Sequence, residues 1–280
     1  MHPDTVLITG CSSGIGRATA RAFLDEDWTV YATARNPADI ETLGDAGAKI
    51  ATLDVTDDDD VERVVSRIVD EDGGVTALVN NAGYGQLGAV EDVPVEQVHR
   101  QFDVNVYGPH RLTRAVLPHM RDAGEGTVVN LSSLAGRVSY PGSGVYCGSK
   151  FAVEAMTDAM RAEVEEYGVH AVLVEPGPVE TGFAERAAAE VEAGGDVPGV
   201  ERSGAYPKLY EILEDMTAMG DDGPGAVPPE AVAEEIVNVA SMTKPPARVP
   251  VGPVAAYGQY ARFLPDGLRD KLYGLARKFL

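Results

Sequence analysis

T-V-L-I-T-G-C-S-S-G-I-G, residues 5–16, joins an apolar run to a glycine-rich turn. Residues 5–9 predict a buried β-strand, and a helix is expected from about Gly14 to Asp25. Glycines at positions 10, 14 and 16 allow a tight turn and let the backbone approach a pyrophosphate, while the helix N-terminus offers free N–H groups to the anion. Because the turn follows the first strand of a βαβ unit, it favours dinucleotide binding over a generic strand-to-helix turn.

Short β-rich runs alternate with helical patterns along the rest of the chain. Further strands are predicted at 28–34, 48–54, 75–80, 126–133, 169–176 and 248–252, and helices after Pro37 and over 58–71, 95–121, 145–167 and 229–241. Either Thr56 or Asp57 could cap the helix at 58–71. Apolar strands that alternate with helices indicate an α/β fold, a Rossmann-type doubly wound parallel sheet of about seven strands with helices on both faces.

One domain is expected over residues 1–280, because no low-complexity linker divides the chain. Residues 183–229 are rich in Glu, Ala, Gly and Pro and are interpreted as a substrate lid within that domain. The chain has no apolar run long enough to span a membrane and no secretory signal, and its two cysteines suit a reduced cytoplasm. The five histidines are scattered without ligand spacing, so no metal site is expected.

The charge balance is strongly acidic, with 44 Asp and Glu against 23 Lys and Arg, a formal net charge of −21. Such a surface repels nucleic acid. The chain could simply be acidic and soluble, but with six lysines and the run Asp57-Asp58-Asp59-Asp60 we favour adaptation to a salt-rich, halophilic cytoplasm.

The end of the second predicted strand, A-T-A-R-N, bears on the choice of cofactor. An acidic side chain there would bind both ribose hydroxyls and repel a 2′-phosphate, but the sequence has Ala34 and Arg35. Arg35, with Ser12 or Ser13, could instead hold the 2′-phosphate, unless it is only a solvent-facing arginine. The sequence therefore favours NADP(H) over NAD(H).

Six motifs occur in order: T-G-C-S-S-G-I-G (9–16), N-N-A-G (80–83), Asn105 in F-D-V-N-V-Y-G, L-S-S-L-A-G (131–136), Y-C-G-S-K (146–150) and P-G-P-V-E-T (176–181). Together they resemble the short-chain dehydrogenase/reductase family over residues 5–182 and the last strand. The sequence around Y-A-T-A-R, N-N-A-G-Y-G and V-E-P-G-P-V-E-T-G-F is similar to that of 17β-hydroxysteroid and retinol dehydrogenase-like members.

The resemblance implies an oxidoreductase that transfers a hydride between nicotinamide and an apolar ketone, aldehyde or secondary alcohol. Tyr146 would be the general acid/base, and Lys150, one turn further along the helix, would lower the pKa of the phenol and hold the nicotinamide ribose. Ser133 would polarise the carbonyl, and Asn105, within the long helix, would hold a water that links Lys150 to solvent. Two alternatives are a 3-oxoacyl-type reductase and a non-catalytic NADP(H)-binding sensor.

The same resemblance implies further cofactor and substrate contacts. The expected cofactor-binding residues are Gly10, Ser12, Ser13, Gly14, Ile15, Gly16, Arg35, Asp54, Val55, Asn81, Ala82, Gly83, Tyr146, Lys150, Pro176, Gly177, Val179 and Thr181. The expected substrate contacts are Ser133, Leu134, Tyr146 and Phe183, in a pocket also shaped by Gln86, Ala135, Val138, Tyr140, Met216 and Met219.

The C-terminal segment 262–280 carries an apolar stripe at helical period, formed by Leu268, Leu272, Leu275 and Phe279. A basic amphipathic helix can lie on a membrane surface. The interpretation we favour here is that the helix packs on the protein itself or on a neighbouring subunit near the substrate entrance, in a homodimer or homotetramer.

The acidic surface predicts a salt dependence. Because self-repulsion is screened at high ionic strength, the melting temperature and the activity should rise from dilute buffer towards molar KCl. A melting temperature that stays flat or falls across a KCl titration would leave only a generally acidic, soluble protein.

Overall fold

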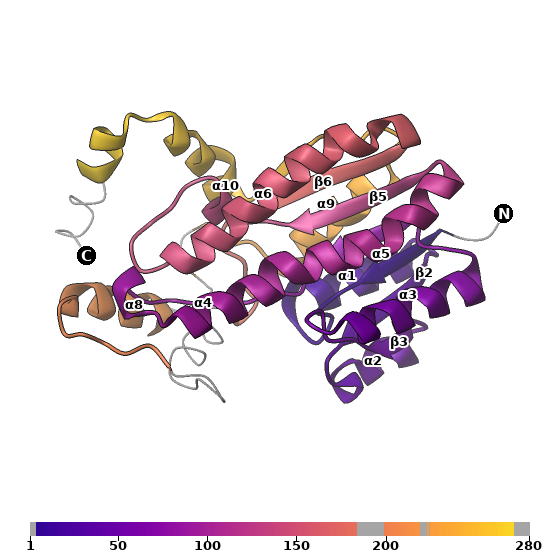
Figure 1. The fold of residues 1–280 in the computed structure, drawn as a ribbon, viewed down its shortest axis with the longest axis horizontal. Helices are drawn as coiled ribbons and strands as arrows, with labels where there is room; N and C mark the ends of the chain where they lie inside the picture. The colour runs from indigo at the N-terminus through magenta and orange to yellow at the C-terminus, as the bar shows by residue number, and fades with distance from the viewer. Residues whose placement is uncertain (1–3, 184–198, 219–222, 224, 272–280) are drawn as a thin grey trace.

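The computed structural model describes residues 4–183, 199–218, 223 and 225–271 (Figure 1). Within these residues, seven parallel strands form one sheet in the order β3-β2-β1-β4-β5-β6-β7. The strands are β1 (Thr5–Ile8), β2 (Thr29–Ala34), β3 (Lys49–Thr52), β4 (Ala77–Asn80), β5 (Gly126–Leu131), β6 (Val169–Pro176) and β7 (Arg248–Val251). The predicted single-domain, doubly wound sheet is confirmed.

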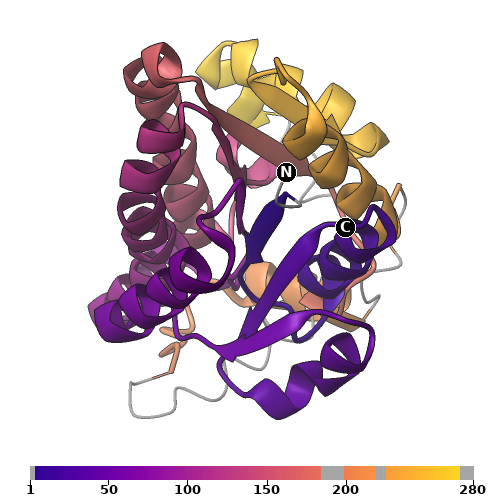
Figure 2. The same ribbon diagram turned by 90° about the vertical axis from the view of Figure 1, so that its right-hand side faces the viewer.

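Helices cover both faces of this sheet, as Figure 2 shows. On one face, α1 (Gly14–Asp25), α2 (Glu41–Asp45) and α9 (Pro229–Ser241) bury Phe23, Leu43 and Ile236 against the strands. On the other face, α3 (Asp58–Asp72), α5 (Gly108–Ala123) and α6 (Gly144–Val164) enclose a second core that includes Ile68 and Leu112. The inner strands β1, β4, β5 and β6 are buried on both faces and largely apolar, and this is the pattern by which they were predicted, whereas the edge strands β3 and β7 are only partly buried.

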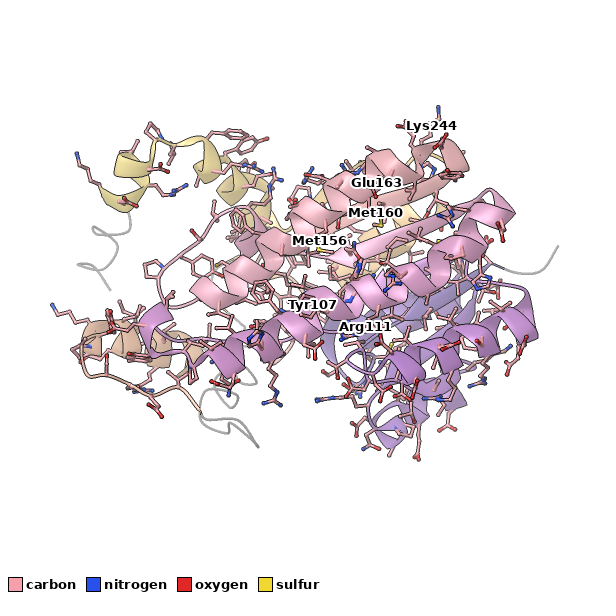
Figure 3. All side chains as sticks on the ribbon, in the orientation of Figure 1. Tyr107, Arg111, Met156, Met160, Glu163 and Lys244 are labelled. Atoms are coloured by element: carbon pink, nitrogen blue, oxygen red, sulfur yellow. The ribbon has the colours of Figure 1, made fainter. Side chains whose placement is uncertain are left out.

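The outer surface of the second helical layer carries large side chains along α5 and α6, including Met156, Met160 and Glu163 on α6 (Figure 3). Met156 is exposed, whereas Met160 packs partly against the core. Among the described residues, no helix is long and apolar enough to cross a membrane.

The predicted helix at 95–121 differs from the structure. The chain forms α4 (Val95–Phe102), then a π-helical turn η3 (Asp103–Tyr107), then α5. The predicted strands 5–9, 28–34, 48–54, 75–80, 126–133 and 248–252 are each longer than the observed ones. In strands 5–9 and 126–133 the surplus residues follow the C-terminal end, where the chain leaves the sheet at the site described below, whereas in strands 28–34 and 75–80 they precede the first paired residue. Asp57, one of the two predicted caps, accepts hydrogen bonds from the Asp59 and Asp60 N–H groups at 2.9 and 3.1 Å and so begins α3.

The described part of the predicted lid folds onto the short turn η2 (Val90–Asp92) and the residues just before it. Helix α8 (Pro207–Ala218) buries Leu209 and Tyr210 against Ala89, and the Tyr210 hydroxyl donates to Asp92 Oδ2 at 2.8 Å. Residue 219 and the side chain of Met216, both predicted to shape the pocket, lie outside the described residues.

Beyond β7 the chain forms α10 (Pro253–Gly258) and η6 (Gln259–Phe263), and it is helical again over 266–271. Of the predicted apolar stripe, only Leu268 lies within the described residues, and it is 46% exposed. Leu272, Leu275 and Phe279 lie outside the described residues, so the packing of the stripe on the protein or on a neighbouring subunit stays a prediction.

Candidate active site

The site begins where β1 and β4 end side by side. From β1 the chain adds β2 and β3 on one side of the sheet, and from β4 onward it adds strands on the other side. Open α/β sheets bind ligands at the point where the strand order reverses in this way. The Thr9 hydroxyl accepts hydrogen bonds from the backbone N–H groups of Asn81 and Ala82 at 3.0 and 2.9 Å. Asn81 Nδ2 in turn donates to the carbonyls of Thr9 and Gly10 at 2.8 and 3.1 Å. Thr9 was not among the predicted site residues, although it lies next to the glycine-rich turn.

The glycine-rich turn is closely packed and needs its glycines. Gly10 has a φ of +71°, and a Cβ atom at Gly16 would lie 2.3 Å from the Gly10 carbonyl oxygen. Ser13 precedes α1 in an extended conformation without a side-chain capping bond, and the first turn of the helix has no acidic side chain. The N–H groups that open α1 at Gly14 and Ile15 therefore suit the pyrophosphate of a dinucleotide.

The segment after β2 places Arg35 on the surface, exposed and without a paired side chain among the described residues. A second arginine, Arg17 in α1, was not predicted. Its guanidinium donates to the Ser12 carbonyl and, at 3.0 Å, to the Asp39 carbonyl. Arg17 thus ties the glycine-rich turn to the turn that follows Arg35.

The predicted adenine and ribose contacts follow the ends of β3 and β4. Asp54 Oδ1 accepts hydrogen bonds from the N–H and hydroxyl of Thr56 at 2.9 and 2.7 Å, which fixes the carboxylate. The Val55 side chain is buried in the core. Gly83 faces the amide of Asn105, since an added Cβ would lie 3.0 Å from Asn105 Oδ1.

The structure brings Tyr146, Ser133 and Phe183 together. Ser133 follows β5, and its hydroxyl lies close enough to the buried Tyr146 phenol to lower the pKa of that phenol. The Ser133 oxygen also accepts from the Ala135 N–H at 3.1 Å. The rings of Tyr146 and Phe183 lie 5.6 Å apart, centroid to centroid. A phenol and a serine hydroxyl next to apolar side chains can bind and protonate a carbonyl oxygen.

The Lys150 ammonium group lies near the Tyr146 ring, as expected, but it forms its hydrogen bond with the main chain. Its Nζ lies 5.9 Å from the centre of the Tyr146 ring, but it donates to the Leu131 carbonyl at 2.7 Å. Burial lowers the pKa of Lys150 to about 8. Burial also raises the pKa of Tyr146 to about 12, and the nearby Ser133 hydroxyl offsets this only in part. Burial therefore dominates the pKa of the phenol in this arrangement, and its lowering by Lys150 stays a prediction.

Asn105 lies in the π-helical turn rather than in a regular helix. Its Oδ1 accepts from the Tyr84 N–H at 3.1 Å, and its Nδ2 donates to the Tyr84 carbonyl at 2.9 Å and to Ser149 Oγ at 3.2 Å. Ser149 then donates to the Tyr146 carbonyl at 2.7 Å. Ser149 was not predicted, and it connects Asn105 to the helix that carries Tyr146 and Lys150.

The segment after β6 lies against the glycine-rich turn. A Cβ atom at Gly14 would be 3.0 Å from Thr181 Cβ. The Gly177 N–H donates to the Val251 carbonyl at 3.0 Å, and Val179 pairs with Val227 in an isolated bridge. Pro176 at the end of β6 and Thr181 beside α1 thus belong to one wall of the same crevice.

A buried ionic cluster behind the site was missed by the sequence analysis. Glu175 in β6 and Glu154 in α6 are almost inaccessible, and Arg248 Nε lies 3.1 Å from Glu175 and 3.0 Å from Glu154. Arg137 contacts the same two carboxylates at 3.7 and 3.4 Å. Burial and the neighbouring Glu154 charge raise the pKa of Glu175 to about 7.

Known proteins are similar to this one over nearly the whole length of the chain. A family model described as short chain dehydrogenase matches residues 4–192. The chain is 32% identical over 271 residues to 3-ketodihydrosphingosine reductase from Bacteroides thetaiotaomicron, and the alignment covers 96% of each protein. It is also 32% identical over 277 residues to NADPH-dependent 3-dehydrocapnine reductase from Ornithobacterium rhinotracheale, which covers 95% of each.

Two further comparisons extend this result. The chain is 34% identical over 265 residues to retinol dehydrogenase 8 from Homo sapiens, covering 88% of this chain and 80% of that protein. Among solved structures, a short-chain dehydrogenase from Streptomyces avermitilis matches with a TM-score of 0.80 at 33% identity, covering 99% of this chain and 97% of the other.

The raised pKa of Glu175 predicts that its protonation stabilises the fold. The native state keeps this proton above the ordinary carboxyl pKa of 4.5, so stability is greatest below that value and falls as pH rises towards 7, by at most about 1.4 kcal/mol per pH unit. Urea unfolding of Glu175→Gln should therefore show a stability that gains on the wild type between about pH 5 and pH 7. Glu163→Gln, at an exposed position on α6, is the control and should keep a constant difference. A constant difference for Glu175→Gln would contradict the assignment.

Proposed function

The chain belongs to the short-chain dehydrogenase/reductase family, and we propose that it is an NADP(H)-dependent oxidoreductase that interconverts an apolar ketone or aldehyde with the corresponding alcohol. The family and the likeness to a retinol dehydrogenase are as the motifs predicted. The observation that carries the proposed reaction is the placement of the Ser133 hydroxyl close to the buried Tyr146 phenol, with Lys150 one turn further along α6.

Each residue has a defined task in this proposal. When bound, the nicotinamide supplies the hydride for reduction or accepts it in the reverse direction. Ser133 donates a hydrogen bond to the substrate oxygen, and Tyr146 donates its proton to the developing alkoxide. The Lys150 ammonium stabilises negative charge that develops on the phenol, while Asn105 fixes the turn of backbone that faces α6.

The preference for NADP(H) rests on Arg35. Its guanidinium is exposed and has no ion pair within the described residues, and no carboxylate occupies the end of β2. Arg17 supports this surface by linking the glycine-rich turn to the turn after Arg35. The NADPH dependence in the name of one relative points in the same direction.

We further propose a cytoplasmic homo-oligomer, a dimer or a tetramer. The support is the exposed outer surface of η3 and α6, where Tyr107 and Met156 are 47% and 42% accessible.

Tyr146→Phe tests the mechanism. Removing the phenol hydroxyl deletes the proton donor, so the turnover number for an apolar carbonyl with NADPH should fall by about 10²- to 10⁴-fold. Binding of NADPH, followed by its fluorescence, should persist. Tyr167→Phe, at an exposed tyrosine beyond the end of α6, should leave turnover unchanged. An active Tyr146→Phe enzyme would rule out this mechanism, and a wild type that binds NADPH without any turnover would favour the sensor.

Arg35→Asp tests the choice of cofactor. Replacing the cation by a carboxylate should remove the hydrogen bonds to the 2′-phosphate and favour the ribose hydroxyls, shifting the ratio of kcat/KM for NADPH and NADH by about tenfold or more towards NADH. Arg21→Asp makes the same charge change at an exposed position of α1 and should leave the ratio nearly unchanged. If Arg35→Asp leaves the ratio unchanged, Arg35 does not bind the 2′-phosphate.

A further inference from the structure

The segment after β7 carries an unusual concentration of exposed apolar side chains. Tyr257, Tyr260, Phe263 and Leu268, here called the aromatic patch, are 78%, 62%, 73% and 46% accessible. Three of the four are aromatic, and they follow one another within a short stretch of α10, η6 and the helical turn beyond. Single exposed apolar residues are ordinary, but a cluster of this kind marks an interaction surface.

The charge around the aromatic patch is opposite to that of the rest of the protein. Residues 253–271 contain three basic and two acidic side chains, whereas residues 1–252 contain 18 basic and 42 acidic ones. Arg262 and Lys271 are exposed, and neither forms an ion pair within the described residues. Arg262 lies over the Phe263 ring, 5.6 Å from its centre. A basic and aromatic surface on an acidic protein suits an anionic partner.

The aromatic patch stands next to the candidate active site. An added Cβ at Gly258, between two of the patch tyrosines, would lie 3.1 Å from the Leu134 side chain. An added Cβ at Gly177, which follows β6, would lie 3.2 Å from the backbone nitrogen of Ala255 in α10. Leu134 and Gly177 are the residues expected to meet substrate and nicotinamide. The patch therefore adjoins one wall of the crevice, at the end of the molecule where Figure 1 shows α10.

We propose that the aromatic patch seats the protein on an anionic lipid surface. Tyrosine and phenylalanine rings enter the interfacial layer, where tyrosine keeps its hydroxyl in contact with water, and Arg262 and Lys271 meet the acidic headgroups. This contact is peripheral, since no described helix crosses a membrane. Contact with lipid would bring the entrance of the crevice to a phase in which apolar carbonyl compounds dissolve. The statement about substrate rests on the proposed function, but lipid binding does not.

A second copy of this chain is the competing occupant. In a two-fold dimer the same patch would face itself, which would bring Arg262 and Lys271 of both copies together. Like charges at such a contact are unfavourable, whereas a lipid surface supplies the opposite charge. The aromatic rings and the local charge thus favour lipid.

Binding to lipid vesicles tests whether the aromatic patch contacts lipid. The wild type should co-sediment with mixed phosphatidylcholine–phosphatidylglycerol vesicles at low ionic strength, and less with phosphatidylcholine alone. Tyr257→Ser/Phe263→Ser should weaken binding by about tenfold or more, because two large apolar side chains no longer enter the lipid. Arg262→Gln/Lys271→Gln should mainly reduce the difference between the two kinds of vesicle.

Tyr167→Ser/Met242→Ser is the matched control, because it also removes two large exposed apolar side chains, from η5 and from the end of α9. It should bind vesicles like the wild type. Circular dichroism checks that every variant is folded. Wild-type protein that stays in solution with anionic vesicles, or an aromatic-patch variant that binds as well as wild type, would overturn the proposal. A loss of oligomers in the aromatic-patch variant, measured by light scattering without any vesicle effect, would assign the patch to a second copy. Turnover of a water-soluble carbonyl, assayed separately, tests the proposed function and not the lipid contact.

Discussion

The site depends on the contact between the ends of β1 and β4, which the Thr9 side chain holds together. Its single hydroxyl accepts bonds from two consecutive N–H groups, of Asn81 and Ala82, and so joins the end of β1 to the segment that follows β4. Asn81 returns two bonds to the carbonyls of the glycine-rich turn. Because these residues are far apart in the chain, the crevice exists only once the parallel sheet has formed. The geometry of the cofactor site is thus a consequence of tertiary structure, although its glycines are visible in the sequence.

Burial determines the protonation of the proposed acid/base residues as much as charge does. Burial keeps the Tyr146 phenol neutral and weakens the affinity of Lys150 for its proton. A neutral phenol is a proton donor, so this arrangement suits carbonyl reduction directly. Alcohol oxidation needs the phenolate, and the Lys150 ammonium, at present bonded to the Leu131 carbonyl, is the nearest cation that could stabilise it. Reduction therefore needs the neutral Tyr146 phenol, whereas oxidation needs its phenolate and a cation, such as the Lys150 ammonium, to stabilise it.

The sequence predicted those parts of the fold whose pattern is local. Strand 169–176 and helix 229–241 have the bounds that were expected, because a continuous apolar run and a helical period each signal one element. The π-helical turn at Asn105 could not be predicted, since it is fixed by bonds to Tyr84 and Ser149 from other segments. Glu175 lay within an apolar strand pattern, and only the fold shows that Arg137 and Arg248 surround it. Spacing identifies candidate groups, whereas burial and distant partners determine their protonation.

The acidic run Asp57–Asp60 shows why charge counts alone do not describe the surface. Asp57 caps α3, Asp58 lies 3.1 Å from Arg111, and Asp60 both accepts the Asp54 N–H and pairs with Arg63. Salt weakens exposed pairs of this kind while it also screens repulsion between unpaired carboxylates. Exposed ion pairs contribute little individually, and acidic side chains outnumber basic ones by nearly two to one. Many carboxylates therefore have no cation available to pair with, so we expect screening of repulsion to be the larger effect of salt.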